Sequence, residues 1–188
     1  MTTARSLRLP LAWVLGLAFF WMARPVAESV WIGGVIVLAG LAIRGWAAGV
    51  LDKDRKLAVS GPYAFTRNPL YVGSFLLGTG AAVAGGRPLL GVVFLGYFAL
   101  AYRTAMAHES TSLEARFRDG YRDYRDSVPS FVPRLSPYRP QPDLGVETTD
   151  FSLARYMRNR EYEAALGAVA GMVLLVLKAT GSLALPSL

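Results

Sequence analysis

The sequence predicts an all-α protein, a multi-pass transmembrane helical bundle of about five spans with an amphipathic helix and a loop that form a pocket on its cytoplasmic side. Three observations favour this fold. Hydrophobic residues make up 53% of the 188 residues. They cluster in blocks near the roughly 20 residues that cross a bilayer, and the basic residues gather on one side of these blocks. We find no internal repeat and no soluble second domain, so residues 1–188 form a single integral membrane domain.

Five apolar blocks predict the spans. They are Leu9–Ala23, Val30–Leu51, Leu70–Gly86, Pro88–Ala107 and Tyr162–Leu185. The first and third blocks are short for a full crossing. The other three hold Arg44, Arg103 and Lys178 toward one end, where long side chains can reach the interface.

The first block also has features of a secretory signal, because Arg5 and Arg8 precede it. However, no small-x-small cleavage site comes before Arg24, and four further blocks follow. We therefore expect this block to remain as a span.

The placement of lysine and arginine predicts the orientation. With the N-terminus inside, 17 of the 20 basic residues fall on the inner side, and only Arg24, Arg87 and Lys178 fall outside. The N-terminus and the chemically rich segments are thus expected in the cytoplasm, and the arginine- and alanine-rich composition favours a bacterial inner membrane. The net charge of +7 fits contact with anionic membrane lipid, so a nucleic-acid partner is not needed to explain it.

The residue inventory excludes several chemistries. The chain has no cysteine, so disulfides and thiolate ligands are excluded. Its one histidine, His108, begins a zinc-protease-like motif, but Ser112 stands where the second histidine must be. Asp52 and Asp54 lack the rest of a calcium loop. We therefore predict no metal site.

The loop between the second and third blocks, Gly61–Tyr71, holds the densest chemistry in the chain. It packs turn formers, an arginine, an amide and two tyrosines into a short stretch between long apolar runs. Simple connection of two helices needs none of this, so we expect the loop to contact a ligand.

The fourth block continues into an amphipathic helix over Arg103–Asp126. Its face is formed by residues that recur at spacings of three and four, namely Glu109, Leu113, Phe117, Tyr121 and Tyr124. The tight turn at residues 85–88 makes blocks three and four an antiparallel hairpin. Its two inner ends therefore lie side by side, which brings Arg67, Asn68 and Tyr71 near Glu109 in one polar pocket.

The remaining segments follow the same reasoning. Prolines end the amphipathic helix and hold Val128–Arg134 extended. Ser136–Thr149 is expected to be an irregular loop. Phe151–Glu163 is expected to be a short surface helix, so that residues 150–185 hold this helix and the last span.

These motifs together resemble those of the isoprenylcysteine carboxyl methyltransferase and phospholipid methyltransferase family. The motifs are Gly-Pro-Tyr-x-x-x-Arg-Asn-Pro-x-Tyr, then Glu-x-x-x-Leu-x-x-x-Phe-x-x-x-Tyr-x-x-Tyr, then Val-Pro-x-Phe-x-Pro, within a motif core of residues 44–134. The family consists of multi-pass membrane enzymes that use S-adenosylmethionine. Asn68 stands where the family has a histidine, and Ser110 stands where it has a second glutamate. Asparagine forms hydrogen bonds but does not titrate near neutral pH.

The resemblance implies methyl transfer from S-adenosylmethionine to a small lipophilic or lipid-borne acceptor at the cytoplasmic membrane surface. It implies Arg67, Asn68 and Glu109 as catalytic residues. The implied cofactor-binding set is Gly61, Pro62, Tyr63, Arg67, Asn68, Pro69, Tyr71, Gly78, Gly80, Glu109 and Leu113. Arg44, Tyr121, Tyr124 and Arg134 are candidates for closing the pocket or contacting substrate. The sequence does not predict whether the acceptor atom is oxygen, nitrogen or sulfur, nor the oligomeric state.

Several alternatives remain open at this point. The chain could be an NADPH-dependent membrane reductase of the sterol-reductase type, or a non-catalytic protein that binds lipid or a partner. Arg67 could bind lipid phosphate, and the two tyrosines of the helix face could serve packing alone. Small residues such as Gly78 could serve helix packing, and Arg44 could either pair with a buried carboxylate or extend to the interface.

Overall fold

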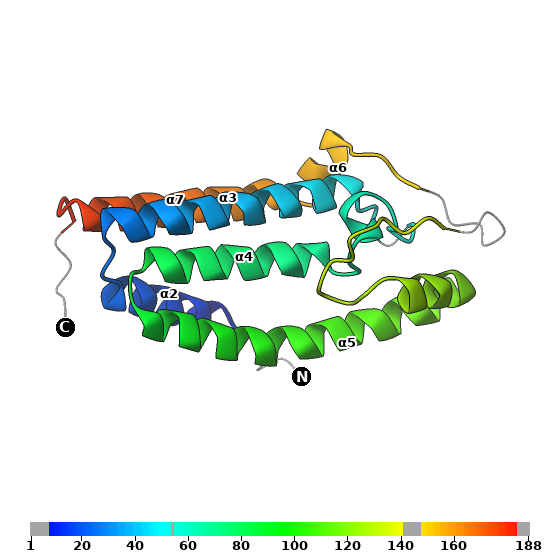
Figure 1. Ribbon diagram of the computed structural model, residues 1–188, viewed down its shortest axis with the longest axis horizontal. Helices are drawn as coiled ribbons and strands as arrows, with labels where there is room; N and C mark the ends of the chain where they lie inside the picture. The colour runs from blue at the N-terminus through cyan, green and yellow to red at the C-terminus, as the bar shows by residue number, and fades with distance from the viewer. Residues whose placement is uncertain (1–7, 54, 141–147, 184–188) are drawn as a thin grey trace.

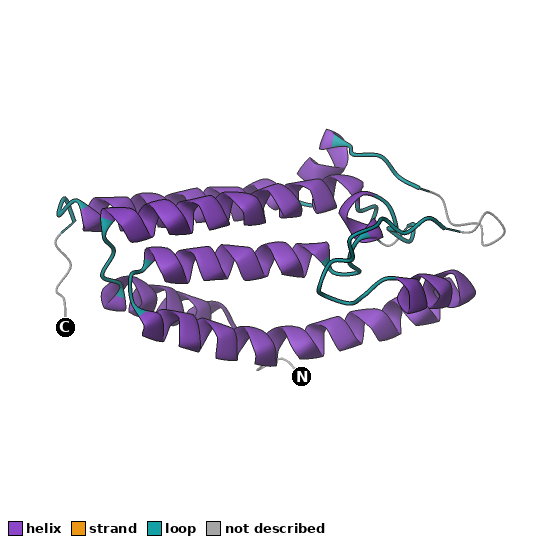
Figure 2. Cartoon of the chain, viewed as in Figure 1, coloured by secondary structure: helices purple, strands orange, loops and turns teal. Residues whose placement is uncertain are grey.

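The described part of the chain folds into an elongated bundle of helices joined by loops (Figure 1). The computed structural model describes residues 8–53, 55–140 and 148–183, with the side chains of residues 15–53, 55–118, 120–140 and 148–183. The helices are α2 (Arg8–Met22), α3 (Ala27–Val50), the short 3₁₀ helix η1 (Gly61–Ala64), α4 (Pro69–Ala84), α5 (Pro88–Ser127), α6 (Leu153–Arg158) and α7 (Glu161–Ala179). These residues contain no strand (Figure 2), which confirms the predicted all-α class.

The number of full-length spans differs from the prediction. Three described helices are long and apolar enough to cross a membrane, over Ala27–Val50, Pro88–Arg118 and Glu161–Ala179. α4 has 16 residues and α2 has 15. At about 1.5 Å per residue, neither reaches the roughly 30 Å of a bilayer core. The expected five spans are therefore corrected to about three, with two shorter apolar helices beside them.

The helix limits lie within three residues of the predicted block limits, with one exception, when Asp126 is taken as the predicted end of the helix that continues block four. α7 ends at Ala179, short of the predicted Leu185, which lies outside the described residues. Thr180 caps the helix, and Gly181 follows with a φ of 73°. That left-handed conformation commonly ends a helix.

The loop regions also follow the prediction in the part that the structure describes. Residues 136–140 and 148–149 form no helix, while residues 141–147 and Arg5 lie outside the described residues. The predicted surface helix over 151–163 is shorter than expected. Arg160, with a φ of 57°, separates α6 from α7.

α3 and α4 pack closely because glycines on both helices remove the side chains between them. A Cβ on Gly33 would lie 2.4 Å from the carbonyl oxygen of Gly80, and one on Gly40 would lie 2.8 Å from that of Gly73. Such distances leave room only for hydrogen at these positions. The small residues of the third block therefore serve helix packing, which is the role they commonly have in membrane bundles.

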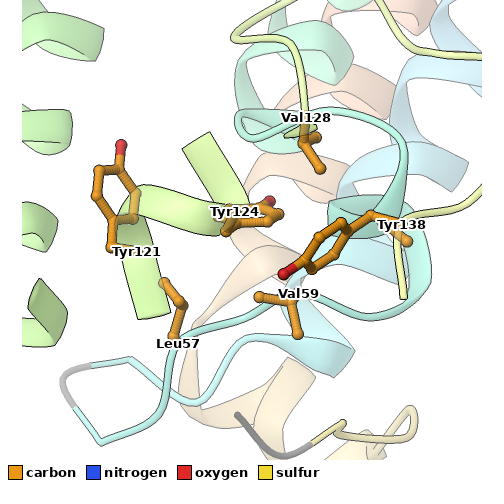
Figure 3. Close-up of a cluster of buried hydrophobic side chains, with 7 residues drawn as sticks. Leu57, Val59, Tyr121, Tyr124, Val128 and Tyr138 are labelled. Carbon is orange, nitrogen blue, oxygen red and sulfur yellow. The ribbon is translucent and has the colours of Figure 1, made fainter. Parts of the chain in front are cut away.

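α5 is antiparallel to α4 and continues past the first residue of α4 (Figure 1). It breaks at Arg118, where φ is 45° and ψ is −115°. The last turns of α5 then carry Tyr121 and Tyr124 into a buried cluster at one end of the bundle (Figure 3). The other members of this cluster come from the loop after α3, from η1 and from the segment after α5, namely Leu57, Val59, Ala64, Val128 and Tyr138. This cluster fixes the position of the loop that was predicted to contact a ligand.

Candidate functional site

A cavity of about 380 Å³ lies at this end of the bundle, between the loop after α3, the start of α4 and the middle of α5. The predicted residues that line it are Tyr63, Arg67, Asn68, Pro69, Tyr71, Glu109, Leu113 and Tyr124. Residues 61–71 and 109–124 thus meet at one hollow, as the hairpin topology predicted. The volume falls within the roughly 300–1,000 Å³ of sites that hold small molecules.

η1 presents one side chain of its motif to the cavity and uses the other two to shape the turn. Gly61 has a φ of 56°, and a Cβ there would lie 3.0 Å from both Trp46 and Val50 of α3. Pro62 starts the 3₁₀ helix. Tyr63 then lines the cavity. Gly61 and Pro62 are not among the lining residues, so their part is to fix the backbone that carries Tyr63.

Arg67 and Asn68 line the cavity, but much of their hydrogen bonding is directed at the segment after α5. Arg67 donates from Nε to the Val128 carbonyl oxygen at 2.9 Å and from Nη1 to the Tyr121 hydroxyl at 3.1 Å. Asn68 donates from Nδ2 to the Ser130 carbonyl oxygen at 2.8 Å. Both side chains therefore join the loop to the segment that follows the amphipathic helix.

Glu109 and two tyrosines bring three oxygen-bearing groups to the cavity. The Tyr71 hydroxyl and the Glu109 carboxylate interact electrostatically across the gap between α4 and α5. Tyr63 is 7% exposed and lies in the electrostatic range of the same carboxylate. Burial first, and then the Glu109 charge, raises the pKa of Tyr63 well above its ordinary value. Tyr63 therefore stays a neutral phenol at physiological pH.

The two tyrosines of the helix face have different positions. Tyr124 lines the cavity and donates its hydroxyl to the Tyr63 carbonyl oxygen at 2.7 Å. Tyr121 is not among the lining residues, and its hydroxyl donates to Ser110 Oγ at 2.8 Å. Each is 1% exposed. Both tie α5 to the loop, which agrees with the packing alternative, and Tyr124 also forms part of the wall.

Besides Gly61, Pro62 and Tyr121, four further predicted site residues lie outside the cavity lining. Gly78 packs against Phe94 of α5, and Gly80 packs against α3. Arg134 donates from Nη1 to the Ser127 carbonyl oxygen at 2.8 Å, near the end of α5. Arg44 forms an ion pair with Glu161. The positions of these residues give them structural contacts, and we do not include them in the site.

The Arg44–Glu161 ion pair joins three helices. Arg44 of α3 donates from Nε and Nη2 to the carboxylate of Glu161 at the start of α7, at 2.9 and 2.7 Å. Its Nη1 donates to the Leu70 carbonyl oxygen and to Ser74 Oγ of α4. Of the two open interpretations of Arg44, the buried carboxylate partner is therefore correct.

The cavity also has basic residues that sequence reasoning did not assign to it. Lys53, Lys56 and Arg116 are among the lining residues. In the sequence, all three had served only in the count of basic residues that predicts membrane orientation. A signal was available, because Lys53 and Lys56 lie in the short segment between α3 and the Gly61–Tyr71 loop. In the described ranges, no group of three or more His, Cys, Asp or Glu side chains is placed to hold a metal ion.

The fold and the cavity define a helical integral membrane protein with a small-molecule-sized site, lined by both charged and apolar side chains, at one end of its bundle. The sequence profile of the phospholipid methyltransferase family matches residues 26–120, which include α3, η1, α4 and most of α5. The chain belongs to this family.

Curated relatives fall into two groups. The chain is 32% identical over 135 residues to a cobalt-zinc-cadmium resistance protein of Cupriavidus metallidurans, covering 66% of this chain and 61% of that protein. It is 28% identical over 133 residues to a nickel-cobalt-cadmium resistance protein of Alcaligenes xylosoxydans, covering 66% and 62%. It is 31% identical over 100 residues to a protein-S-isoprenylcysteine O-methyltransferase of Schizosaccharomyces pombe, covering 53% and 42%.

The chain thus spans about six tenths of the length of the metal-resistance relatives and less of the methyltransferase. No solved structure matches it significantly.

Proposed function

We propose that this protein transfers a methyl group from S-adenosylmethionine to a small lipophilic or lipid-borne acceptor at the cytoplasmic surface of a membrane. The observation that supports this most is the cavity itself, because both segments of the methyltransferase-like motif line it. Family membership and the isoprenylcysteine methyltransferase relatives agree with this activity.

The lining residues fit the chemical groups of this cofactor. The Glu109 carboxylate can bind a cationic group of the cofactor or its ribose hydroxyls. The cationic side chains of Lys53, Lys56 and Arg116 favour a carboxylate such as that of the methionine part. Leu113 and Phe117 give the wall an apolar portion for a flat ring. When bound, S-adenosylmethionine supplies a methyl group on a cationic sulfur.

The protein's contribution is to position the reactants and keep water out. Asn68 is 9% exposed and donates to the Ser130 carbonyl oxygen, so it fixes the cavity wall to the segment after α5. It has no titratable proton near neutral pH. Catalysis in this proposal therefore depends on placement of the acceptor by the cavity wall. It does not depend on a histidine base.

The position of the cavity suits two reactants of different solubility. It lies where the apolar helices α4 and α5 meet the polar loops, so a water-soluble cofactor and a lipid-borne acceptor can approach from different sides. The excess of basic residues on this side supports a cytoplasmic location, and we propose the bacterial inner membrane.

Calorimetry on the full chain in detergent tests the proposal. Wild type should bind S-adenosylmethionine and S-adenosylhomocysteine. Glu109→Ala should weaken binding by at least about tenfold, the effect of losing hydrogen bonds to a charged group. Glu114→Ala is the matched control, because Glu114 lies on the same helix, does not line the cavity and pairs with exposed Arg122 and Arg125.

The outcomes separate the open functions. Binding of both adenosyl ligands, with transfer of labelled methyl from S-adenosylmethionine to a membrane lipid extract, supports the proposal. Binding of NADPH instead would replace it with a reductase, and binding of neither cofactor would favour a non-catalytic protein. Loss of binding in Glu114→Ala equal to that in Glu109→Ala would contradict the site.

A further inference from the structure

Tyr63 is a buried residue whose hydroxyl has no hydrogen-bonding partner among the described residues. Its backbone is fully used, because the amide donates to Ser60 and the carbonyl oxygen accepts from Tyr124. No hydrogen bond to its hydroxyl occurs in the described part of the chain, although the residue is only 7% exposed. Burying a hydroxyl without a partner is costly, so this group needs an explanation.

Tyr63 is one of the residues that line the cavity. Among described side-chain nitrogen and oxygen atoms that are fully removed from solvent, Thr79 Oγ1 alone lacks a partner. The Tyr63 hydroxyl is therefore not sealed within protein, and Tyr63 lines the cavity. A molecule in the cavity can meet it directly.

The surroundings of Tyr63 are those of a cation site. The Glu109 carboxylate and the Tyr71 hydroxyl, both on the cavity wall, lie in its electrostatic range. The charges of Arg44 and Glu161 also act on Tyr63, and they largely neutralise each other in their ion pair. Three elements, η1, α4 and α5, thus bring two phenolic oxygens and one carboxylate to the same part of the cavity. Phenolic oxygens and tyrosine rings both attract onium groups.

We propose that Tyr63, together with Tyr71 and Glu109, forms an oxygen cluster that binds the positively charged onium centre of the bound molecule. For the proposed function, this centre is the sulfonium of S-adenosylmethionine, so the inference rests on that function and adds the location of its charge. The basic residues Lys53, Lys56 and Arg116 line the same cavity from other elements, where they suit the anionic end of the ligand.

The cluster predicts that the cavity binds a cationic ligand more tightly than its neutral analogue, and that the Tyr63 hydroxyl contributes to this preference. S-Adenosylhomocysteine has a neutral thioether at the position of the sulfonium, whereas sinefungin has a protonated amine near it. In Tyr63→Phe, the ratio of onium to thioether affinity should fall by at least about tenfold, because the cationic centre loses its contact with the dipole of one phenolic oxygen. Affinity for S-adenosylhomocysteine should change little, because the ring and its packing remain.

The test is calorimetry of the full chain with S-adenosylmethionine, sinefungin and S-adenosylhomocysteine, for wild type and variants. Tyr97→Phe is the control, since Tyr97 lies on α5, is exposed and is not among the lining residues. A fall in the affinity ratio in Tyr63→Phe but not in Tyr97→Phe supports the cluster. An unchanged ratio, or equal weakening of all three ligands, overturns it.

These outcomes remain separate from the test of the function. If wild type binds none of the three ligands, the proposed function fails and the cluster fails with it. If wild type binds all three and Tyr63→Phe keeps the wild-type ratio, the function stands and only the cluster is wrong. Circular dichroism and size-exclusion profiles of each variant confirm that a change in affinity does not come from unfolding.

Discussion

Replacing Glu161 with glutamine should destabilise the bundle, because it leaves the Arg44 guanidinium buried without its carboxylate. The side chains of Arg44 and Glu161 are 19% and 11% exposed, and two N–H groups of the arginine contact the carboxylate. Removing one partner of such a buried pair costs about 3–5 kcal/mol. Arg44 keeps Leu70 and Ser74 as acceptors, so we expect the lower end, about 3 kcal/mol.

The assay is denaturant unfolding in detergent micelles, followed by circular dichroism. Glu163→Gln is the control, because Glu163 lies in the same first turn of α7 and pairs with Arg160 at the surface. That variant should change stability little. The double variant Arg44→Met with Glu161→Leu should recover most of the loss, since apolar replacements of both partners are often neutral. Wild-type stability in Glu161→Gln, or a double variant as unstable as the single one, would refute this reasoning.

Three further predictions concern the backbone and the buried phenol. Arg118→Gly should stabilise the protein by about 1 kcal/mol in the same unfolding assay, because only glycine adopts its φ of 45° and ψ of −115° without strain; destabilisation would contradict this. Gly40→Ala should destabilise by about 1–3 kcal/mol through a clash with Gly73, whereas Gly91→Ala, which meets open space, should not. Above about pH 10, stability should fall as the unfolded chain ionises at Tyr63 while the folded chain keeps its proton, because its folded pKa is raised. Tyr63→Phe should reduce that alkaline loss in a pH series of unfolding curves, and an unchanged slope would rule it out.

Local patterns predicted the helices and the meeting of the two motif segments well. The apolar blocks predicted the helix ends because turn-forming residues and prolines flank them. The hairpin at residues 85–88 brings Arg67 and Glu109 to the same end of the bundle. The span count was less predictable, because a short apolar helix such as α4 has the composition of a span without its length. Composition alone does not separate these cases.

The candidate site differs from the observed arrangement for two physical reasons. The first is that sequence spacing does not tell which helix a side chain faces. Gly78 and Gly80 were placed in the site by their motif, yet they serve contacts with α5 and α3. Arg44 finds its carboxylate at Glu161, 117 positions away. No local pattern connects two such residues. Lys53 and Lys56 were missed for another reason, because one set of charges can report both membrane orientation and ligand binding.

The segment after α5 is joined to the loop at Arg67 and Asn68 through its main-chain carbonyl oxygens, and this affects how its sequence can vary. Val128, Pro129 and Ser130 accept hydrogen bonds with their carbonyl groups, from the guanidinium of Arg67, its amide and the amide of Asn68. Every amino acid provides that acceptor, so point substitutions along this strip can leave the attachment intact. Insertion or deletion of a single residue would move these carbonyl groups away from their donors on Arg67 and Asn68. We therefore expect related chains to vary in residue identity at positions 128–130 while the number of residues in this segment stays the same.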